Sequence, residues 1–243
     1  MEISQSIKKS YSSQYSESMA EWRLMGAKSK AGNIVELAKE IKFKNVLEVG
    51  SGEGSILYWL SKWNFSDDLN CIEISESGLE MTRARNIEHL KDALLFDGYK
   101  IPYNDNHFDL IYCSHVIEHV EHERILLREI KRVSRYQIFE VPIDFSPYVD
   151  KKLKHFLSYG HINVYTPALF RFLLMTENFV IKKDICGLFN NESLKIMYKD
   201  NKSGLYKMKL RQILLKVSPW FKGLKPNTYT VLTTKKNEEI AIF

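Results

Sequence analysis

The feature that most constrains this chain is a strand-like run, Val46 to Val49, that leads directly into three alternating glycines, Gly50, Gly52 and Gly54. Glycine has no Cβ and adopts positive φ angles at little cost, so the backbone here can turn sharply and lie against a ligand. A helix that begins after such a turn directs its N-terminal N–H groups at the ligand. The stretch therefore predicts a strand, a tight turn and a helix that together hold a nucleotide-like molecule.

Glu73 supplies the second half of this signal. It ends the mostly apolar run Leu69 to Ile72, and it lies about twenty residues after the glycines, where a carboxylate can bind ribose hydroxyls. A dinucleotide fingerprint has its third glycine where this chain has Ser55, which disfavours a dinucleotide. A plain strand-to-helix turn without a ligand remains the structural alternative.

Seven apolar runs of strand length alternate with stretches of helix length, which is typical of an α/β fold. The expected strands are 45–49, 69–74, 93–96, 108–113, 136–141, 179–185 and 228–234. The expected helices are 30–41, 55–62, 77–86, 116–134 and 167–177. We interpret residues 1–243 as a single domain, since the length suits one domain and the 44% apolar content can bury a full core.

The cysteines Cys71, Cys113 and Cys186 are scattered and odd in number, which favours a reducing compartment over a disulfide framework or a zinc cluster. No apolar segment approaches the roughly eighteen residues needed to span a bilayer. We therefore expect a soluble, cytoplasmic protein.

The net charge of +5 is concentrated late in the chain, because Lys195 to Lys236 carries eleven basic residues against one acid, Asp200. Residues 187–226 resemble an insertion between the last two strands, and 205–221 has the pattern of a basic amphipathic helix that Pro219 ends. A flap over the substrate cleft or a contact in a homodimer is the favoured interpretation. A peripheral membrane surface, a phosphate-binding element and a solvated surface stay open.

Several motifs, in order and spacing, resemble those of class I S-adenosylmethionine-dependent methyltransferases over residues 22–236. Glu48 to Gly54 resembles motif I, Glu73 the ribose ligand, and Phe96 to Gly98 the loop whose aspartate meets adenine. Phe108 to Ile111, followed by Ser114 to Val120, resembles the fourth strand and the start of the active-site helix. The resemblance implies a Rossmann-like, seven-stranded, mostly parallel sheet with helices on both faces and a terminal antiparallel hairpin. It also implies S-adenosyl-L-methionine as cofactor and S-adenosyl-L-homocysteine as product.

In this family the segment equivalent to residues 1–30 is a lid over the cofactor, where aromatic rings can face the sulfonium. Trp22 in this lid could equally pack in the core, and Asp97 before Gly98 could simply form a turn. The residues that the resemblance assigns to cofactor binding are Tyr15, Arg23, Glu48, Gly50, Ser51, Gly52, Gly54, Glu73, Ile74, Asp97, Gly98 and Ser114.

The candidate catalytic residues begin with His115, Glu118, His119 and His122, whose spacing would place them on one face of the helix expected at 116–134. His119 is the first choice for a general base, with Glu118 orienting it and His115 near the path of the methyl group. The alternative is that these residues only cap and solvate the start of the helix.

His161 is a further candidate, and it would face the cleft from the opposite wall, ahead of a helix that Thr166 and Pro167 begin. Pro142 and Asp144 are expected at the same cleft edge, after the fifth strand. The segment from His161 resembles one found in members that modify sugars and small metabolites. The Glu118 motif also resembles the magnesium site of ubiquinone-pathway O-methyltransferases and small-RNA 3′-end methyltransferases, but His115 replaces the first glutamate, so we expect no metal.

Together these features predict a methyltransferase acting on a small molecule, through O-methylation of a sugar or nucleotide-activated sugar in surface-polysaccharide biosynthesis. No nucleic-acid partner is expected, because the basic segment alone lacks a broad stripe with stacking aromatics. The alternatives are an RNA methyltransferase, a metal-assisted O-methyltransferase of another small molecule, and a non-catalytic cofactor-binding scaffold.

Overall fold

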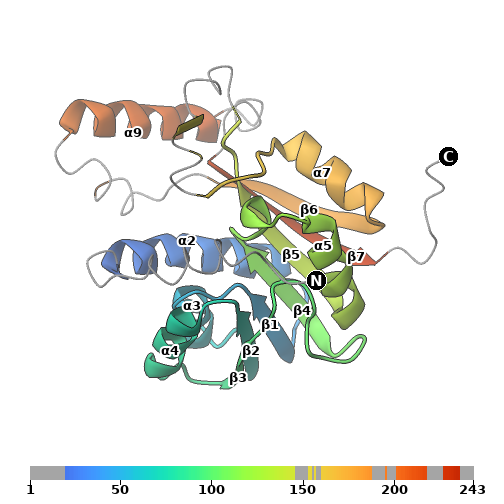
Figure 1. Ribbon diagram of the computed structural model, residues 1–243. Helices are drawn as coiled ribbons and strands as arrows, with labels where there is room; N and C mark the ends of the chain where they lie inside the picture. The colour runs from blue at the N-terminus through green and yellow to red at the C-terminus, as the bar shows by residue number, and fades with distance from the viewer. Residues whose placement is uncertain are drawn as a thin grey trace.

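The computed structural model describes residues 20–145, 153–154, 156, 160–187, 195, 201–217 and 227–235. Their core is one seven-stranded sheet in the order β3-β2-β1-β4-β5-β7-β6 (Figure 1). The strands are β1 Asn45–Val49, β2 Asp68–Glu73, β3 Leu90–Leu95, β4 Phe108–Ser114, β5 Ser134–Pro142, β6 Phe179–Gly187 and β7 Thr228–Lys235.

The first five strands pair in parallel, and β7 pairs antiparallel with both β5 and β6. This confirms the expected Rossmann-like sheet with a terminal antiparallel hairpin. All seven strands lie where the sequence predicts them, with ends shifted by up to three residues.

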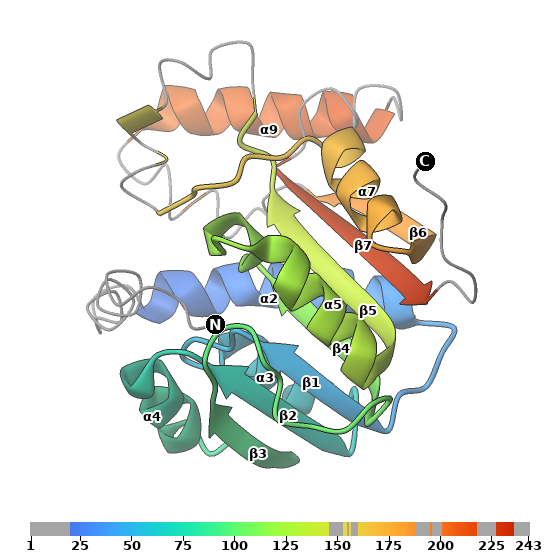
Figure 2. The same ribbon diagram turned by 45° about the vertical axis from the view of Figure 1, so that its right-hand side comes forward.

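Helices cover both faces of the sheet because alternate strand residues point to opposite sides (Figure 2). Leu47 and Val49 belong to a buried cluster with α5 (Glu123–Val133) and α7 (Pro167–Thr176). Val46 belongs to a second buried cluster, on the opposite face, with residues of α2 (Ala20–Ala38), α3 (Ser55–Lys62) and α4 (Glu76–Ala84).

Two helix predictions need correction. The helix expected at 30–41 is α2, which begins at Ala20, ten residues earlier. The single helix expected at 116–134 is instead a short 3-10 turn, η2 (Ile117–His119), followed by α5. Val120 breaks the two apart, because its backbone is extended at φ −90° and ψ 126°.

A helix is present where the basic amphipathic helix was expected, as α9 (Lys202–Val217), while Pro219 lies outside the described residues. Tyr15 and the start of the predicted lid also lie outside them. Within the part of the chain that the structure describes, none of the helices combines the length and apolarity required to cross a bilayer.

Candidate functional site

The glycine loop after β1 adopts the backbone that the sequence predicts. Gly50, Gly52 and Gly54 have φ angles of 76°, 54° and 74°. A Cβ on Gly50 would overlap Cγ2 of the Val116 side chain, so the packing of Val116 against this turn requires glycine there. This bare backbone lines a pocket and offers a ligand direct contact with the main chain.

Glu73 closes the loop from the end of β2. Its Oε2 accepts a hydrogen bond from the N–H of Gly52 at 2.7 Å, and its Oε1 accepts from the N–H groups of Ile74 and Ser75 at 2.8 and 2.9 Å. Burial raises the pKa of Glu73, although these three N–H donors act in the opposite direction. The carboxylate therefore both lines the pocket and holds the glycine loop in shape.

The pocket lies at the carboxyl ends of the parallel strands, which is where ligands bind in open α/β sheets. It is partly open to solvent, and the space inside it together with the solvent at its opening is about 530 Å³. Its lining residues come from the glycine loop, from the ends of β2 and β3 and from the segment after β4: Gly50, Glu73, Ile74, Phe96, Gly98, His115, Val116, His119, Val120 and Leu126.

Four of the predicted cofactor ligands, Gly50, Glu73, Ile74 and Gly98, line this pocket. Glu48 does not, because it is buried beneath the loop and accepts a hydrogen bond from the Tyr112 hydroxyl at 3.0 Å. Burial raises the pKa of Glu48 well above its usual value. Gly52 and Gly54 shape the loop, Ser51 is buried within it, and the Ser114 hydroxyl lies 3.4 Å from Glu140 Oε1.

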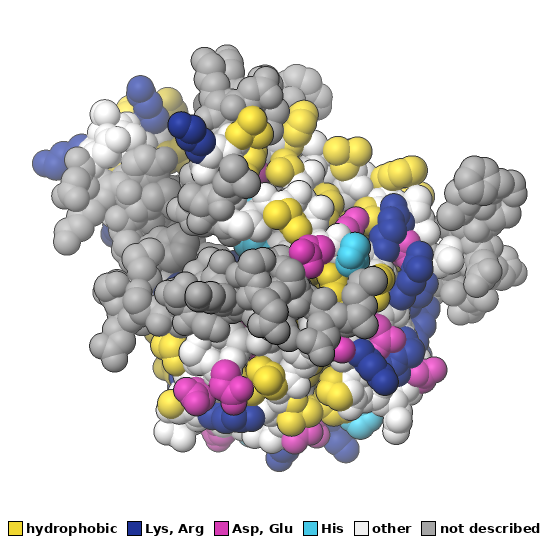
Figure 3. Space-filling view, in the orientation of Figure 1, with side chains coloured by type: hydrophobic (Ala, Val, Ile, Leu, Met, Phe, Trp, Pro, Cys, Tyr) yellow, Lys and Arg dark blue, Asp and Glu magenta, His cyan; other side chains and the backbone are white. Residues whose placement is uncertain are grey.

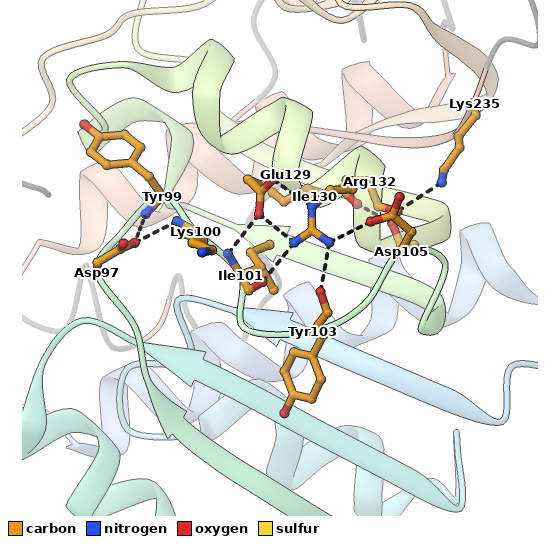
Figure 4. Close-up of polar contacts among 11 residues, drawn as sticks. Asp97, Tyr99, Lys100, Ile101, Tyr103, Asp105, Glu129, Ile130, Arg132 and Lys235 are labelled. Carbon is orange, nitrogen blue, oxygen red and sulfur yellow. Dashed lines mark hydrogen bonds and ion pairs between the residues drawn. The ribbon is translucent and has the colours of Figure 1, made fainter. Parts of the chain in front are cut away.

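Asp97 forms a local turn, which the sequence left open as the alternative to a contact with adenine. Its Oδ1 accepts hydrogen bonds from the N–H groups of Tyr99 and Lys100 at 2.8 and 2.7 Å. The loop that follows is held to α5 by Arg132, which donates to the carbonyls of Ile101 and Tyr103 (Figure 4). Asp97 is thus fixed beside Gly98, and its role toward adenine stays a prediction.

Arg23 has a partner that the sequence did not indicate. Its guanidinium binds the Glu53 carboxylate in the glycine loop at 2.8 Å, and Arg85 binds the other oxygen of the same carboxylate at 2.9 Å. Glu53 is buried, and Ser55 also donates to it at 2.6 Å. The contact ties α2 and the residue after α4 to the loop, so Arg23 acts on the site through Glu53.

His115 follows β4 with a left-handed backbone, at φ 57°, and its N–H donates to the Glu140 carbonyl at 2.8 Å. This turn directs the imidazole between two buried carboxylates, with Nδ1 3.4 Å from Glu118 and Nε2 3.4 Å from Glu140. Burial and the charge of Lys30 lower the pKa of His115, but the two carboxylates outweigh them and raise it overall. The raised pKa favours the protonated ring, which holds a negative charge better than it accepts a proton.

Glu140, on β5, is the centre of this buried network. Its Oε2 accepts hydrogen bonds from the Asn33 amide at 2.7 Å and from the Thr230 hydroxyl at 2.6 Å. Burial alone would raise the pKa of Glu140, yet His115, Lys30 and Thr230 together lower it to about 2. The charged carboxylate therefore joins α2, β4, β5 and β7 beneath the pocket.

His119 lines the pocket, and its ring packs against that of His161, with ring centroids 4.8 Å apart. His119 Nδ1 donates to the Gly160 carbonyl at 2.9 Å, which leaves the lone pair on Nε2. Burial lowers the pKa of His119, although Glu118, with an oxygen 3.8 Å from Nε2, and the bond to Gly160 oppose this. His161 Nδ1 lies 2.6 Å from Asp144, so the structure brings the two predicted walls of the cleft together.

Asn163 holds these two walls in contact, and the sequence pattern gave it no role. Its side-chain amide donates to the carbonyls of Ile117 and Val120, and its backbone N–H donates to the Glu118 carbonyl. The only hint in the sequence is its place two residues after His161, because its partners lie on a separate segment.

The expectation that His115, Glu118, His119 and His122 share one helix face is wrong. His115 precedes the 3-10 turn, and His122 is the N-cap residue of α5, where its ring packs against Tyr99. Glu118, His119 and His161 form the cluster instead, with one potential ligand atom of each within 4.8 Å of the others. This donor set fits a borderline divalent metal, and the expected absence of a metal stays untested.

Residues 47–137 match the family model described as "Methyltransferase domain". The chain is 26% identical over 119 residues to YrhH of Bacillus subtilis (strain 168), which covers 46% of this chain and 66% of that protein. It is 31% identical over 101 residues to the ajmaline N-methyltransferase of Rauvolfia serpentina, which covers 39% of this chain and 34% of that one. These matches therefore span less than two thirds of the relatives' own length.

Among solved structures, the fold is similar to a chain in the complex between the Haloferax volcanii Trm112 methyltransferase activator and a methyltransferase. That likeness has a TM-score of 0.67 at 10% identity and covers 97% of this chain and 100% of the other. The [4+2]-cyclase SpnF is similar with a TM-score of 0.59 at 13% identity, covering 91% and 84% of the two chains. At such low identity both likenesses concern the fold alone.

Proposed function

We propose that this chain, whose residues 47–137 match the methyltransferase-domain model, is a class I S-adenosyl-L-methionine-dependent methyltransferase that transfers a methyl group to a small-molecule acceptor. The observation that carries the proposal is the pocket between the glycine loop and His119. The cofactor fits this loop, because Gly50 and Gly98 present main chain without a Cβ to the pocket and the Glu73 carboxylate lines the same pocket.

S-adenosyl-L-methionine supplies, when bound, a methyl group that is already activated for in-line displacement. The protein must therefore mainly position the acceptor and exclude water from it. Gly50, Glu73, Ile74 and Gly98 would hold the cofactor, and His119 and His161 would bound the acceptor side.

The acceptor in this proposal is a hydroxyl, and the lone pair on His119 Nε2 supports that choice. A hydroxyl loses its proton as the methyl group arrives, and a neutral histidine at the pocket can accept it. Glu118 lies within 3.8 Å of Nε2 and would stabilise the resulting imidazolium. A protonated His115 and the tethered His161 would orient the acceptor.

We further propose that this hydroxyl belongs to a sugar or a nucleotide-activated sugar used in surface-polysaccharide assembly. This part depends on the resemblance of the segment from His161 to sugar-modifying members. The names of the curated relatives include both N- and C-methyltransferases of small molecules. These names support a small-molecule acceptor, and the panel of acceptors below tests its chemical class.

The test is production of S-adenosyl-L-homocysteine by the full chain with a panel of nucleotide sugars, free sugars, small amines and RNA. His119→Ala should lower turnover by roughly 100-fold or more, the scale of a lost general base, with the affinity for S-adenosyl-L-homocysteine retained. His161→Ala serves as the paired variant. Unchanged rates in both would refute the acid/base role, and cofactor binding without turnover on any acceptor would favour a non-catalytic scaffold.

A further inference from the structure

Helix α9 lies outside the site described above, at the same end of the molecule as α7 in both ribbon views (Figures 1 and 2). It carries an exposed apolar row made of Tyr206, Leu210 and Ile213, with exposed fractions of 71%, 47% and 58%. The spacing of four and then three residues places the row on one helix face. Leu205 and Met208, on another face, are only partly exposed.

Lysines flank this apolar row on both sides. Successive helix positions are about 100° apart, so Lys202 and Lys209 lie on one side of the row and Lys207 on the other. All three are exposed. The sequence of Lys202–Val217 contains five basic residues and no acidic residue. An exposed apolar row between lysines is the pattern of a helix that lies in the plane of a membrane surface.

Helix α7 adds a second exposed apolar row at this end, made of Leu169, Phe172 and Met175, with exposed fractions of 54%, 63% and 50%. Figure 3 shows hydrophobic side chains gathered on the upper part of the molecule, where Figure 1 places α7. Exposed apolar groups that gather in this way mark an interaction surface.

Exposure and charge distinguish among three partners that such a surface could contact: the protein's own cleft, a second copy of the chain and an anionic bilayer. A flap over the protein's own cleft would bury the row of α9, but Tyr206, Leu210 and Ile213 are exposed. In a symmetric dimer the same patch contacts itself, so the lysines of the two copies would face one another. An anionic bilayer accepts the apolar row among its acyl chains and pairs its headgroups with the lysines.

We propose that α9 is a peripheral membrane-binding element that lies on the surface of an anionic bilayer. The apolar row enters the interface, and Lys202, Lys207 and Lys209 contact anionic lipid headgroups. This inference is independent of the proposed methyl transfer, because none of these residues lines the pocket.

The test is flotation of the full chain with vesicles of phosphatidylglycerol and phosphatidylcholine in equal parts, against vesicles of phosphatidylcholine alone. The chain should float only with the anionic vesicles, and added salt should weaken the binding because it screens the headgroups. The pair Leu210→Ser with Ile213→Ser should lower the apparent affinity at least tenfold, and so should the pair Lys207→Glu with Lys209→Glu.

The matched control is Lys44→Glu with Lys91→Glu, which makes the same charge change at exposed positions outside α9 and should leave binding within twofold. On the unaltered chain, anionic vesicles should slow hydrogen exchange of peptides from Lys202–Val217, a readout that no substitution can confound. Absence of flotation would overturn the proposal, as would equal loss in the control pair. A dimer that the serine pair dissociates, or binding of single-stranded RNA without binding of vesicles, would overturn it too.

Discussion

The imidazole rings of His119 and His161 pack edge to face at 4.8 Å, although the two residues come from separate segments of the chain. Each ring is fixed through its Nδ1, one to the Gly160 carbonyl and the other to Asp144. Contacts between the two segments, and not helix periodicity, therefore bring these two rings together beside the pocket that His119 lines.

Asn163→Ala tests this relationship. The change removes the two hydrogen bonds from the Asn163 amide to the carbonyls of Ile117 and Val120, so His161 should lose its register against His119. We expect turnover to fall by about 10- to 100-fold, because small misplacements in an active site are costly. Affinity for S-adenosyl-L-homocysteine, measured by calorimetry, should stay the same. Asn104→Ala, at an exposed position, is the control, and equal effects in the two variants would contradict the prediction.

Gly50→Ala should abolish cofactor binding. The new Cβ would overlap Cγ2 of Val116, and the backbone at φ 76° would be strained for alanine. Gly26→Ala is the matched control, because Gly26 is helical and a Cβ added there would have no neighbouring atom within 4 Å. That variant should bind the cofactor normally and gain stability of about 0.5–1 kcal/mol. Calorimetry with S-adenosyl-L-homocysteine and thermal unfolding measure both effects.

Arg85→Ala should destabilise the fold. It leaves the buried Glu53 carboxylate with Arg23 and Ser55 alone, and a buried charge that loses a partner costs free energy. We expect the free energy of unfolding in urea to fall by about 2–4 kcal/mol. Lys39→Ala is the control, because it breaks an exposed ion pair with Glu36 and should change the free energy of unfolding by less than about 1 kcal/mol. Similar values for both variants would show that Glu53 does not depend on Arg85.

The rate of methyl transfer should depend on pH through His119. Because burial lowers the pKa of His119, the ring is neutral and able to accept a proton at pH 7. As the pH falls through this lowered pKa, the ring gains a proton and the rate should drop, with a midpoint below the ordinary histidine value of about 6.5. The pH profile of kcat measures this. An acid limb that survives unchanged in the residual activity of His119→Ala would assign it to another group.

Stability should decline at low pH through Glu140, whose folded-state pKa of about 2 lies below the unfolded value near 4.3. A carboxylate with a lowered pKa contributes stability that is fully present above the unfolded value and is lost as the pH falls toward the folded one. Glu140→Gln should therefore destabilise the protein at pH 7, with a difference from the unaltered chain that shrinks toward pH 2. Urea unfolding at several pH values checks this, and Glu80→Gln, at an exposed position, should show no such trend.

Local patterns were enough to predict the sheet and the glycine loop that lines the pocket. Gly50 and Glu73 could be assigned because a glycine that needs positive φ and a carboxylate at a strand end are constraints within a few residues. The break at Val120 could not be predicted in this way, since no proline or glycine marks it and the spacing of His115, Glu118 and His122 suits a continuous helix.

The sequence by itself determined the α/β class, the seven strands and the glycine loop, because strand periodicity and glycine backbone freedom are local properties. Only the tertiary structure decided that His115 lies between Glu118 and Glu140 and that Asn163 brings His161 to His119. These contacts join residues that are distant in the chain. Their energies depend on burial and on partners from other strands, and those exist only once the sheet has formed.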